Sequence, residues 1–567
     1  MVTVFYSRVF FLMLMVKEHR VFLCILVFFL LLRVPLLFTS QGYLDADEAV
    51  VALMAKHIVE KGEHPVFFSG LPYNGGASVE AHLAALLSYL FGLSRLTVKV
   101  SVLLLSLCLL VATYMFCLRY LGRASANIAS LLLVAAEPLI IWNLKARGGY
   151  LETMLFTVLI PWIALRIFFH EGERLLYSAL FGFFCGLALW CQEMSLSLLG
   201  AMFLFWFISD RTFFLRRFFA VFLIFFALGN GPAIYYNLTH NFINWRHMFT
   251  FLPSEASRYI QHATPQAVTL SSFFTHAAGF FEIISDGWEG WPIEPRDLSL
   301  FAWASFGVVL VGVSAALYLS WRSQWHWRIS LLCLVYFILH LITVYVSSYR
   351  MGGGIYRFYL PLYPLLSVDL AIFCVSLRGR RWGLAVIMVL LLMFSGHGAM
   401  KNIHFLGVEP VWTHPDFEIH RGKIQPIPVR TGGESITKAV EFLRSHGIRS
   451  VITSVYIKYR LIFESREEIN ATSQIVPPPI DPYIYYDRLV QEDRTGPFAF
   501  VFFNASAANK YLLRLLKEEK VPWTQKTIHE LTIYYPFTRA DLERMFRHTP
   551  AKSFFTPEVR GSGERSP

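Results

Sequence analysis

Three carboxylates lie close together directly after the first long apolar segment of the chain. Asp45, Asp47 and Glu48 follow residues 21–39, a segment that is apolar enough to cross a bilayer. Carboxylates beside a membrane are costly to place, so their presence needs an explanation. A carboxylate held at the start of a helix could accept a proton from a hydroxyl group and so act as a general base.

Helix capping explains part of this cluster as well as catalysis does. Asp45 and Glu48 have the spacing of a capping box, and Asp47 also favours a helix N-terminus. Asp47 is not needed for the box. It is therefore the first candidate for the base, with Asp45 and Glu48 as groups that orient the base or the incoming hydroxyl.

Four cations could bind an anionic group near the same membrane surface. Lys145 and Arg147 lie in one short loop, and Arg350 and Arg357 flank a glycine-rich stretch, residues 351–355. Arginine and lysine are the usual means of holding a phosphate and of neutralising its charge as it departs. The alternative is that these side chains only reach lipid headgroups. The glycine-rich stretch favours function for Arg350 and Arg357.

Further polar residues follow the carboxylates in the same loop. Residues 71–76 end in a turn, Asn74-Gly75-Gly76, and lead into an amphipathic helix that can lie in the membrane interface. A plain surface helix explains most of this segment, but its polar side chains could also contact substrate hydroxyls. The candidates for such contacts, the last two of them second-line, are Tyr73, Asn74, Glu80, Glu152 and Glu193.

Composition places these residues on a membrane protein. The chain has 567 residues, of which 55% are hydrophobic and 16% charged, and its mean hydropathy is +0.49. These values exclude a water-soluble globular protein. The predicted fold class is an α-helical polytopic membrane protein with about eleven spanning segments. These segments are 21–39, 98–118, 125–142, 152–169, 175–190, 194–209, 218–236, 300–320, 329–347, 358–377 and 382–399.

The distribution of charge predicts the topology. With a cytoplasmic N-terminus, every predicted inner loop carries a basic cluster, as the positive-inside rule requires. Loops 40–97 and 237–299 and residues 400–567 then lie outside, and residues 1–20 form a cytoplasmic or interfacial extension of the membrane domain 21–399. Topology and contact with the lipid bilayer explain the net charge of +11, so we expect no nucleic-acid partner.

The polar C-terminal region predicts a small extracytoplasmic α/β domain. Residues 434–446 have the pattern of an amphipathic helix, and residues 450–456 and 497–504 have the patterns of strands. The final stretch around residues 561–563 is predicted to be disordered. All seven cysteines lie in or beside apolar segments, so we expect no disulfide and no cysteine-ligated metal.

Three of these segments resemble one superfamily of membrane enzymes. Residues 357–364, R-F-Y-L-P-L-Y-P, resemble the R-Y-L-x-P-x-Y-P signature of GT-C-fold glycosyltransferases, with Arg357 in place of the signature arginine. The pair Asp47-Glu48 and residues 71–87 are similar to parts of the first outer loop in that superfamily, which includes protein O-mannosyltransferases and aminoarabinose transferases. The chain thus resembles an uncharacterised bacterial branch, which implies a bacterial inner or plasma membrane.

The resemblance implies a specific reaction. A hexosyl or pentosyl group would move, with inversion, from a polyprenyl-phosphate donor to a hydroxyl of a glycan, lipid or protein acceptor on the extracytoplasmic side. The donor phosphate would lie near Arg357 or Arg350, and Asp47 would take the proton. Such a reaction requires no cofactor, and the carboxylate cluster leaves a divalent metal possible. Two rivals stay open, a lipid-linked-sugar flippase or transporter and a non-catalytic membrane scaffold.

Overall fold

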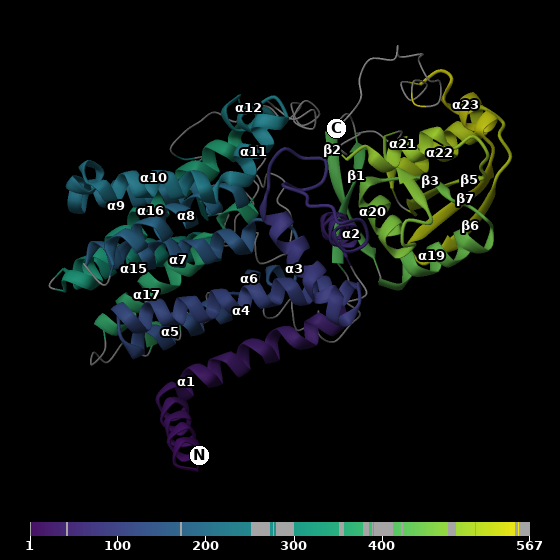
Figure 1. Cartoon of the computed structure of the whole chain (residues 1–567). Coiled ribbons are helices and arrows are strands. Elements are labelled where there is room, and N and C mark those ends of the chain that lie inside the picture. The colour runs from purple at the N-terminus through teal and green to yellow at the C-terminus, as the bar shows by residue number, and fades with distance from the viewer. Residues whose placement is uncertain are drawn as a thin grey trace.

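The chain folds into a bundle of long helices beside a smaller domain built on a sheet (Figure 1). The structure, a computed structural model, describes residues 2–40, 44–169, 173–250, 300–321, 323–350, 356–377, 412–420, 423–431, 433–474, 483–504 and 506–549, together with isolated positions within 271–278 and 385–390 and residue 554. Helix α2 (Ala46–Lys61) lies between the bundle and the sheet domain (Figure 1).

Seven helices in the described part of the chain are long and apolar enough to cross a bilayer, which makes the protein an integral membrane protein. They lie within α1 (Val2–Ser40), α4 (Arg95–Tyr120), α7 (Tyr150–Phe168), α8 (Arg174–Cys191), α9 (Ser195–Asp210) with the short helix η1 (Arg211–Leu215), α15 (Leu300–Ser320) and α16 (Gln324–Arg350). An eighth span forms if α10 (Arg217–Gly229) and α11 (Gly231–Thr239), which meet at an angle of 59°, count as one.

The predicted count of about eleven is therefore not confirmed. The segment 125–142 is divided at Ala136 into two short helices, α5 (Arg123–Ala135) and α6 (Glu137–Trp142). The segment 358–377 opens with a 3-10 turn, η4 (Tyr356–Tyr359), which leaves α17 (Leu362–Ser376) only 15 residues long. Most of 382–399 lies outside the described residues. The predicted N-terminal extension is continuous with the first span in α1.

Helices α8 and α10 approach so closely at their glycines that no side chain fits at those positions. A Cβ atom on Gly186 would lie 2.1 Å from the carbonyl oxygen of Phe226, and one on Gly229 would lie 2.0 Å from that of Phe183. Small residues permit such close approach of helices within a bilayer. This contact fixes the end of α10 and hence the bend into α11.

The C-terminal domain is α/β, as predicted. Its five-stranded sheet has the order β4-β3-β5-β7-β6, with β3 parallel to both neighbours and β7 antiparallel to both of its own. All six residues of β5 are buried, which explains the continuous apolar run in the sequence. The strands are β3 (Ser450–Thr453), β4 (Asn470–Thr472), β5 (Phe498–Phe503), β6 (Thr524–Ile528) and β7 (Leu531–Phe537).

In chain order, five helices of the described residues lie before, between and after the strands of this sheet. They are α19 (Gly433–Ser445), α20 (Val455–Glu464), α21 (Tyr485–Glu492), α22 (Ala507–Glu518) and α23 (Arg539–Phe546). Helix α19 and strand β5 agree with the elements predicted from the sequence. The predicted strand 450–456 is shorter in the structure, because β3 ends at Thr453 and α20 begins at Val455. A separate antiparallel pair, β1 (Trp412–His420) and β2 (Lys423–Thr431), precedes them.

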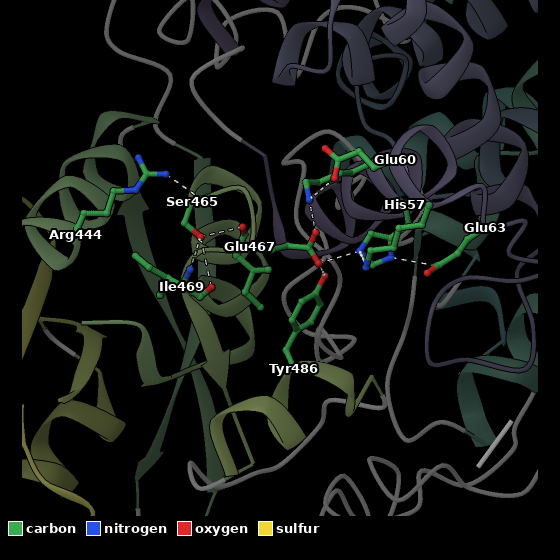
Figure 2. Close-up of polar contacts among 11 residues, drawn as sticks. His57, Glu60, Glu63, Arg444, Ser465, Glu467, Ile469 and Tyr486 are labelled. Atoms are coloured by element: carbon green, nitrogen blue, oxygen red, sulfur yellow. Dashed lines mark hydrogen bonds and ion pairs between the residues drawn. The ribbon is translucent and has the colours of Figure 1, made fainter. Parts of the chain in front are cut away.

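One carboxylate of the C-terminal domain, that of Glu467, binds side chains near the end of α2 (Figure 2). Glu467 accepts hydrogen bonds from Lys56 and from Tyr486, the latter at 2.8 Å, and its Oε1 lies 2.9 Å from His57 Nε2. Arg466 and Glu467 both have positive φ, +55° and +67°, a conformation that is uncommon outside glycine. The turn thus directs Glu467 at the helix that carries the three carboxylates.

Candidate functional site

The capping box predicted from the sequence is present at the start of α2. Asp45 Oδ1 accepts a hydrogen bond from Glu48 N at 2.9 Å, and Glu48 Oε2 accepts one from Asp45 N at 3.0 Å. Both side chains are fully buried. The spacing of these two residues therefore serves to begin the helix.

The second oxygen of Asp45 is held by the loop before α7. Asp45 Oδ2 lies 2.7 Å from Arg147 Nε, 2.6 Å from Arg147 Nη2 and 3.7 Å from Lys145 Nζ. Burial raises the pKa of Asp45, but the two cations and the hydrogen bond from Glu48 lower it by more, so that the pKa falls to about 2. Arg147 and Lys145 are buried, so they do not extend to lipid headgroups. Burial and the neighbouring Arg147 lower the pKa of Lys145 to about 8.

Glu48 pairs with a cation that the sequence analysis missed. Lys99 Nζ, within α4, donates to Glu48 Oε1 at 2.9 Å and to the carbonyl oxygen of Leu144 at 3.2 Å. The backbone N–H of Ala146 also points at Glu48 Oε1, at 3.3 Å. A signal was present, because Lys99 is the only charged residue within the apolar run 98–118, and a charge inside such a run is costly unless it has a partner.

Asp47 is the carboxylate that stays accessible. Its side chain is 48% exposed, whereas those of Asp45 and Glu48 are 0% and 1% exposed. The Asp47 carboxylate lies 4.0 Å from Arg147 Nη1. The structure thus separates the three acids into two that are buried in ion pairs and one that is partly exposed beside a cation.

Arg357, in the short helix η4, is an electrostatic neighbour of Asp47. Its guanidinium is hydrogen-bonded to Tyr150 and lies 5.9 Å from the centre of that ring. Burial lowers the pKa of Arg357, but its electrostatic neighbours Tyr150, Asp47 and Tyr73 raise it more, so the net direction is upward. Arg350 is the last residue of α16. Its side chain and the glycine-rich stretch lie outside the described residues.

The turn at residues 74–76 interlocks with the loop that carries Arg147. Asn74 adopts a positive φ of +66° and donates from Nδ2 to the carbonyl oxygen of Arg147 at 3.3 Å. A Cβ atom on Gly76 would lie 2.1 Å from Gly149 N, so no larger residue fits at position 76. The sequence predicted the turn but not its partner.

Glu80 and Glu152 are buried beneath this turn. Glu80, from α3 (Gly76–Phe91), accepts a hydrogen bond from Gly148 N at 2.7 Å, and Glu152 is one of its nearest charged neighbours. Both carboxyls are at most 3% exposed. The hydrogen bond accepted by Glu80 supports the loop at Arg147, and contact of either carboxyl with a substrate stays a prediction.

Tyr73 and Glu193 line a cavity of about 300 Å³ next to this cluster. The ring of Tyr73 stacks on that of His247, with 4.4 Å between centroids. Burial raises the pKa of Glu193 to about 7, and burial together with the charge of Glu193 raises that of Tyr73 to about 12. The cavity also has lining residues that sequence reasoning missed, notably Trp190, Asn230, Asn244 and Trp245.

These carboxylates do not by themselves make a metal site. Within the described ranges, no three His, Cys, Asp or Glu side chains gather as metal ligands would. Asp45 and Glu48 direct their oxygens at Arg147, Lys99 or backbone N–H groups, so only Asp47 is left to coordinate a cation. A divalent metal stays a prediction, and no chemical step is assigned to it.

Solved structures match the fold of this chain over most of its length. ArnT from Cupriavidus metallidurans bound to undecaprenyl phosphate matches with a TM-score of 0.55 and 12% identity, over 90% of this chain and 97% of that one. The same protein in its apo state matches with a TM-score of 0.56 and 12% identity, over 93% of this chain and 98% of that one.

An archaeal protein has the same fold. The Archaeoglobus fulgidus oligosaccharyltransferase in complex with Zn and sulfate gives a TM-score of 0.52 and 11% identity, over 88% of this chain and 69% of that one. No protein-family model matches the sequence, and neither does any curated protein. At these identities the likeness shows the fold, which is the GT-C fold that the sequence resemblance implied.

Proposed function

We propose that the chain is a membrane glycosyltransferase that moves a sugar from a polyprenyl-phosphate donor to an acceptor hydroxyl on the extracytoplasmic side. One observation carries the proposal. Asp47 is the accessible acid of its cluster, and it is an electrostatic neighbour of both Arg147 and Arg357. A carboxylate base facing cations is what a displacement at a phosphate-linked sugar needs.

The reaction would be a single inverting displacement. Asp47 takes the proton of the acceptor hydroxyl while the oxygen of that hydroxyl bonds to the anomeric carbon of the donor. The bond from that carbon to the phosphate oxygen breaks, and polyprenyl phosphate leaves with the electron pair. Arg357, with Arg350 as the second candidate, stabilises the charge of this leaving group.

The buried acids and cations would position these groups. Asp45 holds the Arg147 guanidinium, which presents Nη1 to Asp47 at 4.0 Å. Lys99 and Glu48 secure the helix start on which Asp47 stands. Lys145 and Arg147 would therefore act on the donor phosphate chiefly through the field they create at the site.

Two further observations support this assignment. The ArnT structure with the same fold was solved with undecaprenyl phosphate, a lipid phosphate of the proposed class. The basic clusters in the predicted inner loops favour an outward-facing site, because α2 and the C-terminal domain then share the outer compartment.

The test is glycosyl transfer in proteoliposomes with labelled polyprenyl-phosphate sugars. Asp47→Asn should reduce turnover by roughly 10²–10⁴-fold, and Arg357→Ala by roughly 10²–10³-fold. Glu173→Gln and Arg217→Ala are matched controls. Both residues are exposed and lie at the N-terminal ends of α8 and α10, away from the site, so the turnover of these two variants should equal that of wild type. Equal turnover in all five proteins would remove Asp47 and Arg357 as catalysts.

A transporter of lipid-linked sugars is the second candidate, favoured by the 59° break between α10 and α11. Broken helices at a binding site are typical of secondary transporters. The two functions differ in covalent chemistry. Movement of an intact labelled lipid-linked sugar between leaflets, without transfer to any acceptor, would favour the transporter.

A further inference from the structure

The cavity beside Tyr73 has walls from four separated parts of the chain. Phe67 and Tyr73 come from the loop before α3, Trp190 from the end of α8, and Trp245 from α12 (Ile243–Thr250). The fourth wall is the bend between α10 and α11. Tyr73 is an electrostatic neighbour of both Glu193 and Arg357, so the cavity adjoins the proposed reaction centre.

Three polar atoms of the lining residues are buried without a hydrogen-bond partner. They are Asn74 Oδ1, Asn230 Oδ1 and Glu193 Oε1. Asn230 is only 7% exposed. Buried polar atoms are almost always paired, because leaving one unpaired costs free energy. Three such atoms around one cavity point to a ligand with several hydroxyl groups.

The break in the helix presents Asn230 to the cavity. Asn230 is the residue between α10 and α11, where the chain turns by 59°. A Cβ atom on Gly186 would lie 2.7 Å from Asn230 N, so the close helix packing fixes this residue from behind. Irregular backbone at a membrane helix is tolerated where it lines a cavity.

Hydrogen bonds connect the lining residues to one another and to the loop before α3. Trp190 Nε1 donates to the carbonyl oxygen of Val66 at 3.0 Å, and Trp245 N donates to Asn237 Oδ1 at 3.0 Å. Asn237 also donates to Asn244 Oδ1 at 3.0 Å, and Asn244 Nδ2 donates to the carbonyl oxygen of Pro72 at 2.7 Å. Aromatic rings beside amide groups suit the apolar face and polar edge of a sugar ring.

The lining also restricts the charge of the ligand. Among the described lining residues there is no Lys or Arg, and Glu193 is the one acidic side chain. An anionic group such as a phosphate or a uronate would meet no counter-charge there and would face a carboxyl. The volume of about 300 Å³ is at the lower end of ligand cavities and suits one small ring.

We propose that this cavity is a saccharide subsite that binds one uncharged monosaccharide ring through Asn230, Glu193 and Asn74, between Trp190 and Trp245. The inference rests on the proposed function for its place in a reaction, and it names the substrate group that the site selects. The ring belongs either to the donor or to a glycan acceptor.

The test is a tryptophan-fluorescence titration of the full chain in nanodiscs with a panel of methyl glycosides of neutral hexoses and pentoses. Wild type should bind at least one glycoside with a saturable, measurable affinity. Asn230→Ala should weaken that affinity about tenfold, the loss typical of one hydrogen bond to a ligand. Ala233→Leu, which fills the cavity from α11, should abolish the signal.

Asn127→Ala is the matched control, because Asn127 also has a buried, unpartnered amide oxygen but lies in α5, outside the cavity. Its affinity should equal wild type. Displacement of the glycoside by a polyprenyl-phosphate sugar would assign the subsite to the donor, and simultaneous binding would assign it to the acceptor. Either result supports the subsite.

Two outcomes overturn the subsite. One is equal affinity in wild type and Ala233→Leu, and the other is no saturable signal with any glycoside. Neither outcome touches the proposed function, which turnover tests. Conversely, cavity-dependent binding without turnover by wild type would overturn the glycosyltransferase and leave the subsite standing.

Discussion

Arg147 contacts a single oxygen of Asp45 through two nitrogens, Nε at 2.7 Å and Nη2 at 2.6 Å, although the two residues are 102 positions apart in the chain. The pair is buried. It joins the start of α2 to the loop before α7, and that junction sets where Asp47 stands relative to the cations around it.

Breaking the Asp45–Arg147 pair should destabilise the fold. Asp45→Asn removes the nearest counter-charge of the buried Arg147 and Lys145, which we expect to cost roughly 3–5 kcal/mol. Thermal unfolding in detergent, with Arg147→Met and the double variant to complete a cycle, measures the coupling. Glu18 and Arg123, 3.5 Å apart but more than half exposed, form the control pair, whose loss should cost about 0–1 kcal/mol. Equal losses for the two pairs would contradict the argument.

Alanine at Gly148 should disrupt the interlocked loops. A Cβ atom there would lie 2.5 Å from Ala77 N, and Gly148 has a φ of +68°. The clash and the strained backbone together should cost more than the roughly 1–3 kcal/mol of ordinary overpacking. Gly62→Ala separates the two effects, since Gly62 has a similar φ of +66° but open space around it. The unfolding temperature of Gly148→Ala should therefore fall below that of Gly62→Ala.

Removing the Glu467 charge should loosen the C-terminal domain from α2. Glu467→Gln weakens the contacts with Lys56, His57 and Tyr486, at a cost of roughly 1.5–3 kcal/mol for hydrogen bonds to a charged group. Hydrogen exchange at the end of α2 measures the change. Glu468→Gln is the control, because Glu468 is 63% exposed and pairs only with Arg444 among the described contacts. Unchanged hydrogen exchange in Glu467→Gln would show that the Glu467 charge does not hold the C-terminal domain against α2.

The same contact should weaken in acid. Burial raises the pKa of Glu467, but hydrogen bonds from His57, Lys56 and Tyr486 lower it more, so the folded pKa is below the ordinary value. The stabilisation is then complete above the unfolded pKa, near 4.3, and is lost as the pH falls towards the folded value. Exchange at the end of α2 should rise below about pH 4 in wild type and change less in Glu467→Gln.

Glu193 should give stability the opposite dependence on pH. Burial raises its pKa from 4.5 to about 7, so between these values the folded state binds more protons than the unfolded state. Stability should therefore fall as the pH rises across this window, by at most about 3 kcal/mol. Unfolding temperatures of wild type and Glu193→Gln, compared from pH 5 to 8, measure it. Parallel curves would show that Glu193 is not buried as described.

Local patterns in the sequence determined much of this protein. Hydropathy located the seven long apolar helices of the described residues, because a span must be a continuous apolar run, although the count of about eleven is not confirmed. The spacing of Asp45 and Glu48 determined the capping box, because its bonds join residues within one turn. The same reasoning singled out Asp47 as the acid that the box does not use. The strand patterns in the C-terminal region were equally local.

Only the tertiary structure decided how these residues are paired. The contacts of Asp45 with Arg147, of Glu48 with Lys99 and of Glu467 with α2 join segments up to 411 positions apart. The cavity at Asn230 likewise exists because α8 and α10 pack at glycines. Spacing along a helix fixes which neighbours meet within a turn, whereas packing of whole helices fixes which distant charges are buried together, and no local pattern encodes that choice.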